Sequence, residues 1–241
     1  MKTTLKTLAL FITLTLTSCN ANLNLGDGID GSGNVITEKR NIETPFTKID
    51  ASTGVEVIVE QGATTEVEVE VDDNLLENII TTVENGTLIV KIEGNINTME
   101  TAIVRIKTNT IDGLETSSGA TIRSKNTLKG TNLKVKSSSG SEVTLELEFE
   151  EVDSESTSGS EIKLSGKALV LKTKSSSGSE INAQDLAANE ISAQSTSGSS
   201  TMVNPIVLLN AKASSGSSIE YIKDPKKLLK EETSGGSVSK N

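Results

Sequence analysis

The 241-residue sequence contains no histidine and no tryptophan, with only one tyrosine and three phenylalanines. Without histidine, the chain lacks the side chain that most often serves as a general base or a metal ligand. The shortage of aromatic rings argues against an ordinary globular core and against a stacking platform for carbohydrates. The hydrophobic core must therefore be built from valine, isoleucine, leucine and small residues.

An excess of acidic residues restricts the possible partners. The sequence has 23 Lys and Arg against 33 Asp and Glu, a formal net charge of −10. Binding to nucleic acid relies on basic side chains that neutralise phosphates, so this balance excludes nucleic acid as a partner. Carboxylates are so numerous that no pair stands out as the acid and base of a glycosidase. We therefore expect a protein that is not an enzyme.

The first residues have the pattern of an export signal. Lys2 and Lys6 precede an apolar run at residues 8–16, which is too short to span a bilayer. The sequence LTSC at residues 16–19 resembles the lipobox of bacterial lipoproteins, in which the cysteine is acylated and becomes the mature N-terminus. The alternative is an ordinary signal peptide followed by an unrelated cysteine.

We expect residues 1–18 to be a lipoprotein signal peptide and Cys19 to carry acyl chains such as palmitate. Two or three such chains are enough for stable anchoring in a membrane. The protein is thus expected to be exported and anchored to the bacterial cell envelope, with the outer membrane favoured and its periplasmic or outer face left open. Cys19 is the only cysteine, so no disulfide can stabilise the fold.

Residues 19–33 are polar and glycine-rich, which predicts a lipidated, flexible tether. Residues 34–107 are rich in predicted strands, because segments 55–60 and 66–71 alternate aliphatic and acidic side chains. Asn85-Gly86 lies between two further strand-like segments and predicts a β-hairpin. This N-terminal part, in which Gly54 resembles a divergent repeat glycine, forms either the first rungs of a stack or a cap over its end.

A serine-flanked glycine recurs seven times in the rest of the sequence. Successive glycines are 21, 19, 19, 20, 18 and 19 residues apart. A fixed period near 20 residues indicates a solenoid whose rungs cover one another's hydrophobic faces. We expect each glycine to allow a bend or a positive φ at a place where a side chain would crowd the next rung. The structural repeat glycines are Gly119, Gly140, Gly159, Gly178, Gly198, Gly216 and Gly235.

Alignment of the repeats predicts which side chains point inward. The positions three and five after the glycine and seven before it are mainly aliphatic, and strand alternation directs them to the same side. The Ser and Thr residues one and three positions before the glycine share this parity. We therefore expect their hydroxyls to point inward and to hydrogen-bond between rungs. A bend at the glycine that exposes them is the alternative.

The positions at even offsets are predicted to face water. Four positions before the glycine, the charges alternate in sign over the first four rungs, which favours the correct register. This outward row is Glu115, Lys136, Glu155, Lys174, Gln194, Lys212 and Glu231.

Two positions after the glycine, three like charges are predicted to stack on successive rungs. These residues, Glu142, Glu161 and Glu180, are the candidate site for a divalent metal ion such as Ca²⁺ or for a cationic partner. The alternative is a solvated ladder of carboxylates relieved by nearby lysines, for which we expect Lys136, Lys163 and Lys174. No other cofactor is expected.

Several motifs in order along the chain resemble the head GIN domain family. They are PFTKI at 45–49, VEVIV at 55–59 with QG at 61–62, DNLL at 73–76, NGTLIV at 85–90, and the serial SGSEV or SGSEI units. This family is common in exported lipoproteins of the Bacteroidetes type and bears the label "putative autotransporter adhesin". The resemblance covers residues 34–222 and implies an all-β, right-handed parallel β-helix. It implies no catalytic residues.

We expect regular β-solenoid rungs of about 19 residues at 108–222. Residues 223–241 are expected to form a C-terminal cap or a last irregular rung, with a frayed tail from Ser237. The expected function is that of a non-catalytic, membrane-anchored interaction or adhesion scaffold for a cell-surface or envelope protein or glycan. The alternatives are a periplasm-facing structural or stress protein and, less favoured, a calcium- or polysaccharide-binding module.

Overall fold

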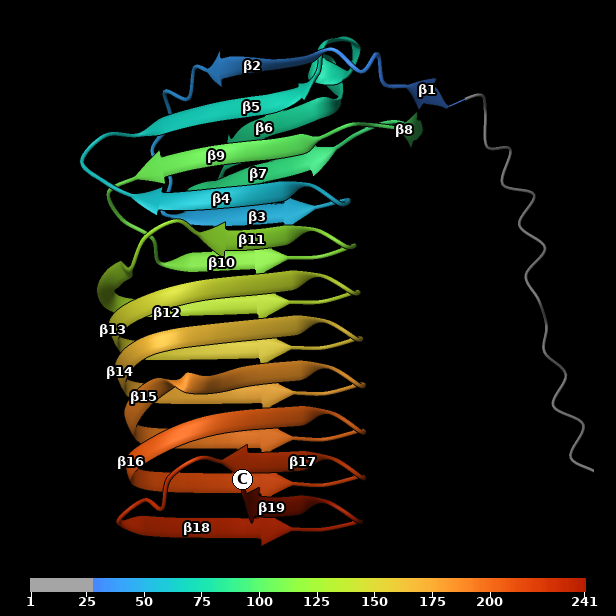
Figure 1. Ribbon diagram of the computed structural model, residues 1–241. Coiled ribbons are helices and arrows are strands. Elements are labelled where there is room, and N and C mark those ends of the chain that lie inside the picture. The colour runs from blue at the N-terminus through green and yellow to red at the C-terminus, as the bar shows by residue number, and fades with distance from the viewer. Residues whose placement is uncertain (1–27) are drawn as a thin grey trace, which may run out of the picture.

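The computed structural model describes residues 28–241 and shows an all-β solenoid (Figure 1). It has about seven turns, with rungs about 19 residues apart, as the spacing of the glycines predicts. The predicted signal peptide and the predicted lipidation site, Cys19, lie outside the described residues. Within residues 28–241, no helix has the length and hydrophobicity needed to span a membrane.

Each rung consists of two strand segments that form opposite walls. The segments leading into a repeat glycine stack in parallel as the pre-glycine wall, and those that follow it stack as the post-glycine wall. The longest strands run from the post-glycine wall round a curved edge into the pre-glycine wall (Figure 1). They are β13 (Glu142–Ser156), β14 (Glu161–Ser175), β15 (Glu180–Ser195) and β16 (Ser200–Ala213). The shorter segments are β10 (Gly113–Thr116), β11 (Thr121–Ser124), β12 (Leu128–Ser137), β17 (Ser218–Tyr221), β18 (Lys227–Glu232) and β19 (Ser237–Lys240).

A type I′ turn at each repeat glycine joins the two walls. In one example, Ser139 and Gly140 have φ values of 54° and 69°, and Ser141 N donates to Ser138 O at 3.3 Å. Gly140 N donates to Ser158 O of the next turn at 3.2 Å, so the turns are also hydrogen-bonded to one another. These turns form the straight edge of the solenoid, here the turn edge (Figure 1).

The positive φ is what requires glycine in these turns. A Cβ atom built on Gly140 or Gly159 would meet nothing within 4 Å, so the expected crowding by the next rung is wrong. Gly54 belongs to the same series, because Thr53 and Gly54 have φ values of 61° and 76° and Gly54 N donates to Ser118 O at 3.0 Å.

The aliphatic positions predicted to point inward fill the space between the walls. Val143, Ile162 and Ile181, three positions after successive glycines, are fully buried and directly adjacent in the strand register. The buried hydrophobic side chains form one continuous cluster from Phe46 to Val238. A long, thin core of aliphatic residues thus replaces the aromatic core that the composition excludes.

Buried hydroxyls lie three positions before and one position after the glycine. Ser137 and Ser141 are both buried, with their Oγ atoms 2.8 Å apart. Ser160 of the next rung donates to Ser137 O at 2.7 Å, so hydroxyls link the rungs as expected. The expectation is wrong one position before the glycine. Ser139 is exposed there, because its positive φ in the turn interrupts the strand alternation.

Residues 34–108 extend the stack and then close it. The rung of β3 (Lys48–Ser52) and β4 (Glu56–Gln61) pairs in parallel with β10 and β11 on one side. On the other side it pairs in parallel with β7 (Thr87–Ile92) and β9 (Ala102–Thr108). The antiparallel strands β2 (Val35–Arg40), β5 (Glu66–Asp72) and β6 (Ile79–Glu84), with the 3-10 helix η1 (Asp73–Asn78), lie at this capped end (Figure 1). The predicted hairpin is confirmed, since β6 and β7 pair antiparallel around Asn85-Gly86.

The ordered contacts begin earlier than the predicted tether allows. β1 (Ile29–Asp30) pairs with β8 (Ile96–Thr98), inside the segment assigned to the tether. The buried carboxylate of Asp72 accepts hydrogen bonds from Gly33 N at 2.7 Å and Glu100 N at 2.9 Å. Residues 28–33 are therefore part of the domain rather than of a free linker.

The C-terminal residues form a complete last rung. β18 pairs in parallel with β16, and β19 pairs in parallel with β17. The expectation of a frayed tail from Ser237 is wrong, because Val238 continues the inward column after the last turn and is buried.

Candidate interaction surface

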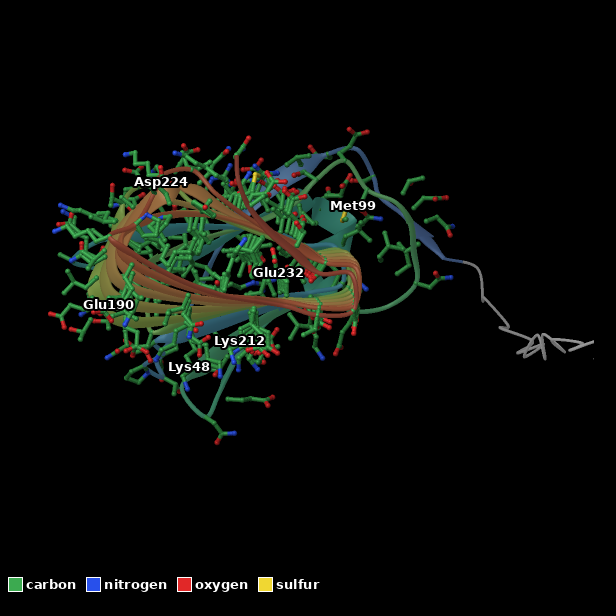
Figure 2. The ribbon with its side chains drawn as sticks, turned by 90° about the horizontal axis from the view of Figure 1, so that it is seen from below. Lys48, Met99, Glu190, Lys212, Asp224 and Glu232 are labelled. Atoms are coloured by element: carbon green, nitrogen blue, oxygen red, sulfur yellow. The ribbon has the colours of Figure 1, made fainter. Side chains whose placement is uncertain are left out.

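The outward side chains four positions before each repeat glycine form a row along the pre-glycine wall. Strand register places each residue beside the next. Viewed along the solenoid axis, Lys212 near the C-terminal end and Lys48 near the opposite end both point away from this wall into solvent (Figure 2). We call the row the charged column: Asp50, Glu115, Lys136, Glu155, Lys174, Gln194, Lys212 and Glu231.

Two shallow clefts open on the charged column. One, of about 410 Å³, is lined by the column from Glu155 to Glu231 and by neighbouring serine and threonine residues. The other, of about 420 Å³, lies toward the capped end over Asp50, Glu115 and Lys136. An extended partner lying along this wall would therefore meet charges and hydroxyls in both clefts.

Several charged side chains in the column have no ion-pair partner in the described part of the chain. Lys212 Nζ lies 2.9 Å from Glu231 Oε2 at the C-terminal end. Among the residues that the structure describes, by contrast, no carboxylate lies within ion-pair distance of Lys136 or Lys174, and no cation lies within that distance of Glu155. The alternation predicted from the sequence is thus present, while these side chains stay available to an external ligand.

The alternation fails at the capped end, where two carboxylates are adjacent. Asp50 lies directly beside Glu115 in the register of β3 and β10. Burial and the neighbouring Glu115 carboxylate raise the pKa of Asp50 above its ordinary value. A cationic group bound in this cleft would relieve that repulsion.

The candidate metal residues lie on the opposite wall, in line as predicted. Glu142, Glu161 and Glu180 are adjacent in the strand register. Lys163 Nζ lies 2.9 Å from Glu161 and 3.6 Å from Glu142, and Arg123 lies 3.7 Å from Glu142. The hydrogen bond with Glu161 raises the pKa of Lys163.

Basic side chains therefore already neutralise much of this ladder. Lys163 was expected there, whereas Lys136 and Lys174 belong to the pre-glycine wall, and Arg123 was not foreseen. Residues 28–241 contain no group of three or more acidic or thiol side chains arranged around one ion position. The Ca²⁺ site at Glu142, Glu161 and Glu180 stays a prediction, which calorimetric titration of the chain and its Glu161→Gln variant with Ca²⁺ would test.

A third surface, at the curved edge, is not predicted by the alignment of the repeats. Leu169 and Ile206 are 53% and 45% exposed and line an open cleft of about 660 Å³ with the ring of the buried Phe149. The Phe149 ring lies over Gly130, where a Cβ atom would come within 2.6 Å of it. The apolar run at 205–209, which breaks the strict alternation of the repeats, is the signal that could have revealed this patch.

Comparison with known families identifies the fold. The family model described as "putative auto-transporter adhesin, head GIN domain" matches residues 45–225. The chain belongs to this family. The family label indicates an adhesion-type role at the cell envelope and suggests that the protein is not an enzyme. No curated protein matches the sequence.

Solved structures share the same architecture. A "putative adhesin" from Bacteroides fragilis is 23% identical, with a TM-score of 0.83 over 89% of this chain and 100% of that one. A second, from Parabacteroides merdae, is 21% identical, with a TM-score of 0.71 over 90% and 100% of the two chains. A protein from Parabacteroides distasonis, titled a "putative lipid binding protein", is 18% identical, with a TM-score of 0.72 over 89% and 100%. At these identities the likeness establishes the fold.

Proposed function

We propose that this head GIN domain protein is a non-catalytic lipoprotein, anchored to the outer membrane through Cys19, whose solenoid binds a partner along the charged column. The observation that carries the proposal is a set of charges in the two clefts that have no ion-pair partner among residues 28–241: Lys136, Lys174 and Glu155. Membership in an adhesin-type family supports the same class of function.

The geometry of the wall suits a chain-like partner. Adjacent rungs of a β-sheet are about 4.8 Å apart, so the charged column offers a contact at each such step. An exposed charge contact contributes only about 0.2–1 kcal/mol, so useful affinity requires several contacts at once. We infer that the partner is an extended protein segment or a glycan with charges of both signs, at the cell surface or in the envelope.

The proposed anchor determines which end of the solenoid faces the membrane. The described chain enters at the capped end (Figure 1), and Gly28 is nine residues after Cys19. Nine residues span at most about 30 Å when fully extended. The capped end would therefore lie near the membrane, with the charged column running away from it.

A charge reversal on the column tests the binding surface. The full chain with Lys136→Glu and Lys174→Glu should capture at least about fivefold less partner from envelope extracts, since two attractive contacts become repulsive. The matched control is Lys223→Glu, which reverses an exposed lysine outside both clefts. Equal capture by both variants would contradict the proposal.

Protease treatment of intact cells separates an adhesin from the periplasm-facing alternative. A protein displayed on the outer face is expected to be degraded under conditions that leave a periplasmic marker intact. Cys19→Ser, which removes the proposed acylation site, should release the chain from the membrane fraction. Survival of the anchored chain in intact cells would instead support the structural or stress role.

A further inference from the structure

The two ends of the solenoid are built differently, because antiparallel strands extend one end whereas the other stops at the edges of its last parallel rung. At the capped end, antiparallel β2 and β5 continue the sheet beyond β9. At the other end, β18 pairs with β16 and β19 pairs with β17, and no strand within residues 28–241 pairs with their outer edges. β18 thus leaves a row of backbone N–H and C=O groups open to another chain.

The charge pattern of this open edge is complementary to itself when two copies run antiparallel. Residues 226–232 read KKLLKEE, basic in the first part and acidic at the end. If two copies of β18 pair antiparallel with Leu229 opposite Leu229, Lys227 lies opposite Glu231 and Lys226 opposite Glu232. Opposite residues of an antiparallel pair point to the same face of the sheet, so their side chains can meet. By symmetry each Lys–Glu contact occurs twice, once with each copy supplying the lysine. Leu229, an apolar side chain that is 46% exposed, lies on the symmetry axis.

Other arrangements bring like charges together. If Lys230 instead of Leu229 lies on the symmetry axis, Lys230 is opposite its own copy. If Leu228 lies on the axis, Lys226 is opposite Lys230. A parallel pairing in the register of the solenoid would stack each Lys and Glu on its own copy. Like charges directly opposite each other on neighbouring strands are destabilising, so the pattern selects one antiparallel register.

The interior of the last rung is closed by polar groups. Lys230 and Glu232 occupy inward positions that alanines hold in the preceding rung. Their charged groups are 3.7 Å apart, and Glu232 Oε1 accepts a hydrogen bond from Val238 N across the interior at 2.6 Å. Glu232 lies between the two walls in the view along the axis (Figure 2). This neutral pair covers the aliphatic core, so the edge of β18, rather than the core, is what a second chain can engage.

We propose that the open end binds a second copy of this chain, tail to tail, through antiparallel pairing of β18 around Leu229. Because both copies use the same edge, this pairing stops at two chains and forms a closed, two-fold symmetric dimer. It shares Glu231 with the charged column but uses none of Lys136, Lys174 and Glu155, the charges that carry the proposed function. Combined with the anchor at the capped end, it would place the two anchors at opposite ends of the dimer, in the geometry that joins two membranes.

Sedimentation of the full chain carrying Cys19→Ser tests the dimer. We expect a monomer–dimer equilibrium that weakens as salt is raised. Lys227→Glu, which keeps every residue of the charged column, should raise the dissociation constant about tenfold or more. Adding Glu231→Lys to that variant restores opposite charges across the axis and should recover dimerisation. Glu190→Lys, a reversal of an exposed carboxylate away from the edge, is the control and should leave the equilibrium unchanged.

A cross-link tests the register directly. In the Cys19→Ser background, Leu229→Cys places the only thiols of the two copies opposite each other, at about 4.5–5.5 Å between Cα atoms, within reach of a disulfide. Oxidation should give a covalent dimer, whereas Glu190→Cys should not. A chain that stays monomeric at about 100 μM overturns the proposal. Higher oligomers overturn it as well. So does a dimer whose dissociation constant is unchanged by Lys227→Glu and in which Leu229→Cys forms no cross-link.

Discussion

The two edges that join the walls obey different rules. At the turn edge, every rung from Gly119 to Gly235 makes the same hydrogen-bonded turn. The turn at Gly54 shares the positive φ values, and each turn from Gly54 on is bonded to the next. At the curved edge, the register shifts between Lys163 and Ser165 and between Ala183 and Ala187. Differences in rung length are therefore absorbed at the curved edge. The chain keeps one edge constant and lets the other vary, and the exposed apolar patch lies on the variable one.

Insertion of one residue should destabilise the fold most, and should distinguish the two edges most clearly. An alanine inserted between Ser158 and Gly159 removes the turn and flips the following strand, so we expect at least about 4 kcal/mol of destabilisation. An alanine inserted between Leu169 and Val170, at the curved edge, should cost only about 1 kcal/mol. Denaturant unfolding of both variants measures the difference. Equal losses would show that the curved edge is as strictly specified as the turns.

Gly166→Ala is the next largest expected effect. Gly166 has a φ of 105°, and an added Cβ would lie 2.1 Å from Leu147 O, a backbone atom. Strain and a forced backbone shift together should cost about 3 kcal/mol, measured by thermal or denaturant unfolding. A variant as stable as the parent would mean that the curved edge moves freely to make room.

Gly159→Ala at the turn edge should have a smaller effect. Its φ of 71° is unfavourable for alanine, yet no atom lies within 4 Å of the added Cβ. We expect about 1 kcal/mol of destabilisation, from the backbone conformation alone. A loss as large as that of Gly166→Ala would indicate that the turn ladder itself is disrupted, which amide hydrogen exchange at Gly140 and Gly159 would reveal.

The smallest expected effect is that of Asp50→Asn. The register beside the turn edge places Asp50 next to Glu115. The raised pKa of Asp50 means that its ionised form destabilises the fold at neutral pH. Asp50→Asn should therefore raise the melting temperature at pH 7. This gain should shrink as the pH falls through the raised pKa, and disappear below the unfolded value of about 3.9.

Glu148→Gln provides a control of the opposite sign. Lys129 and Lys167 hold the pKa of Glu148 below its ordinary value. The substitution should lower the melting temperature at neutral pH, with a loss that fades as the pH falls through that lowered pKa. If both variants respond to pH in the same direction, the local charges do not govern these two sites.

The sequence predicts the parts of the fold that repeat. The glycine spacing indicates the rungs, and the aliphatic column through Val143, Ile162 and Ile181 indicates the interior. It predicts the charged column for the same reason, because stacking turns a spacing along the chain into a row in space.

Features that occur once, or that depend on a turn, were not accessible in this way. The positive φ of Ser139 interrupts the alternation and exposes a hydroxyl that parity assigns to the interior. Ile206 lies at a local register shift between Pro205 and Leu208, and Leu169 is exposed at the same curved edge; no column alignment contains either feature. The early start of the domain depends on Asp72, a single carboxylate that receives backbone N–H groups from two distant segments.

Because the turn edge is the same in every rung, the number of rungs can change without any change at the two ends of the solenoid. One more unit of about 19 residues, inserted between two repeat glycines, would lengthen the solenoid by about 4.8 Å and leave both the capped end and β18 unchanged. Loss of a unit would shorten it by the same step. The protein is thus built as a graduated spacer, in which the number of repeats determines how far the last rung stands from the first.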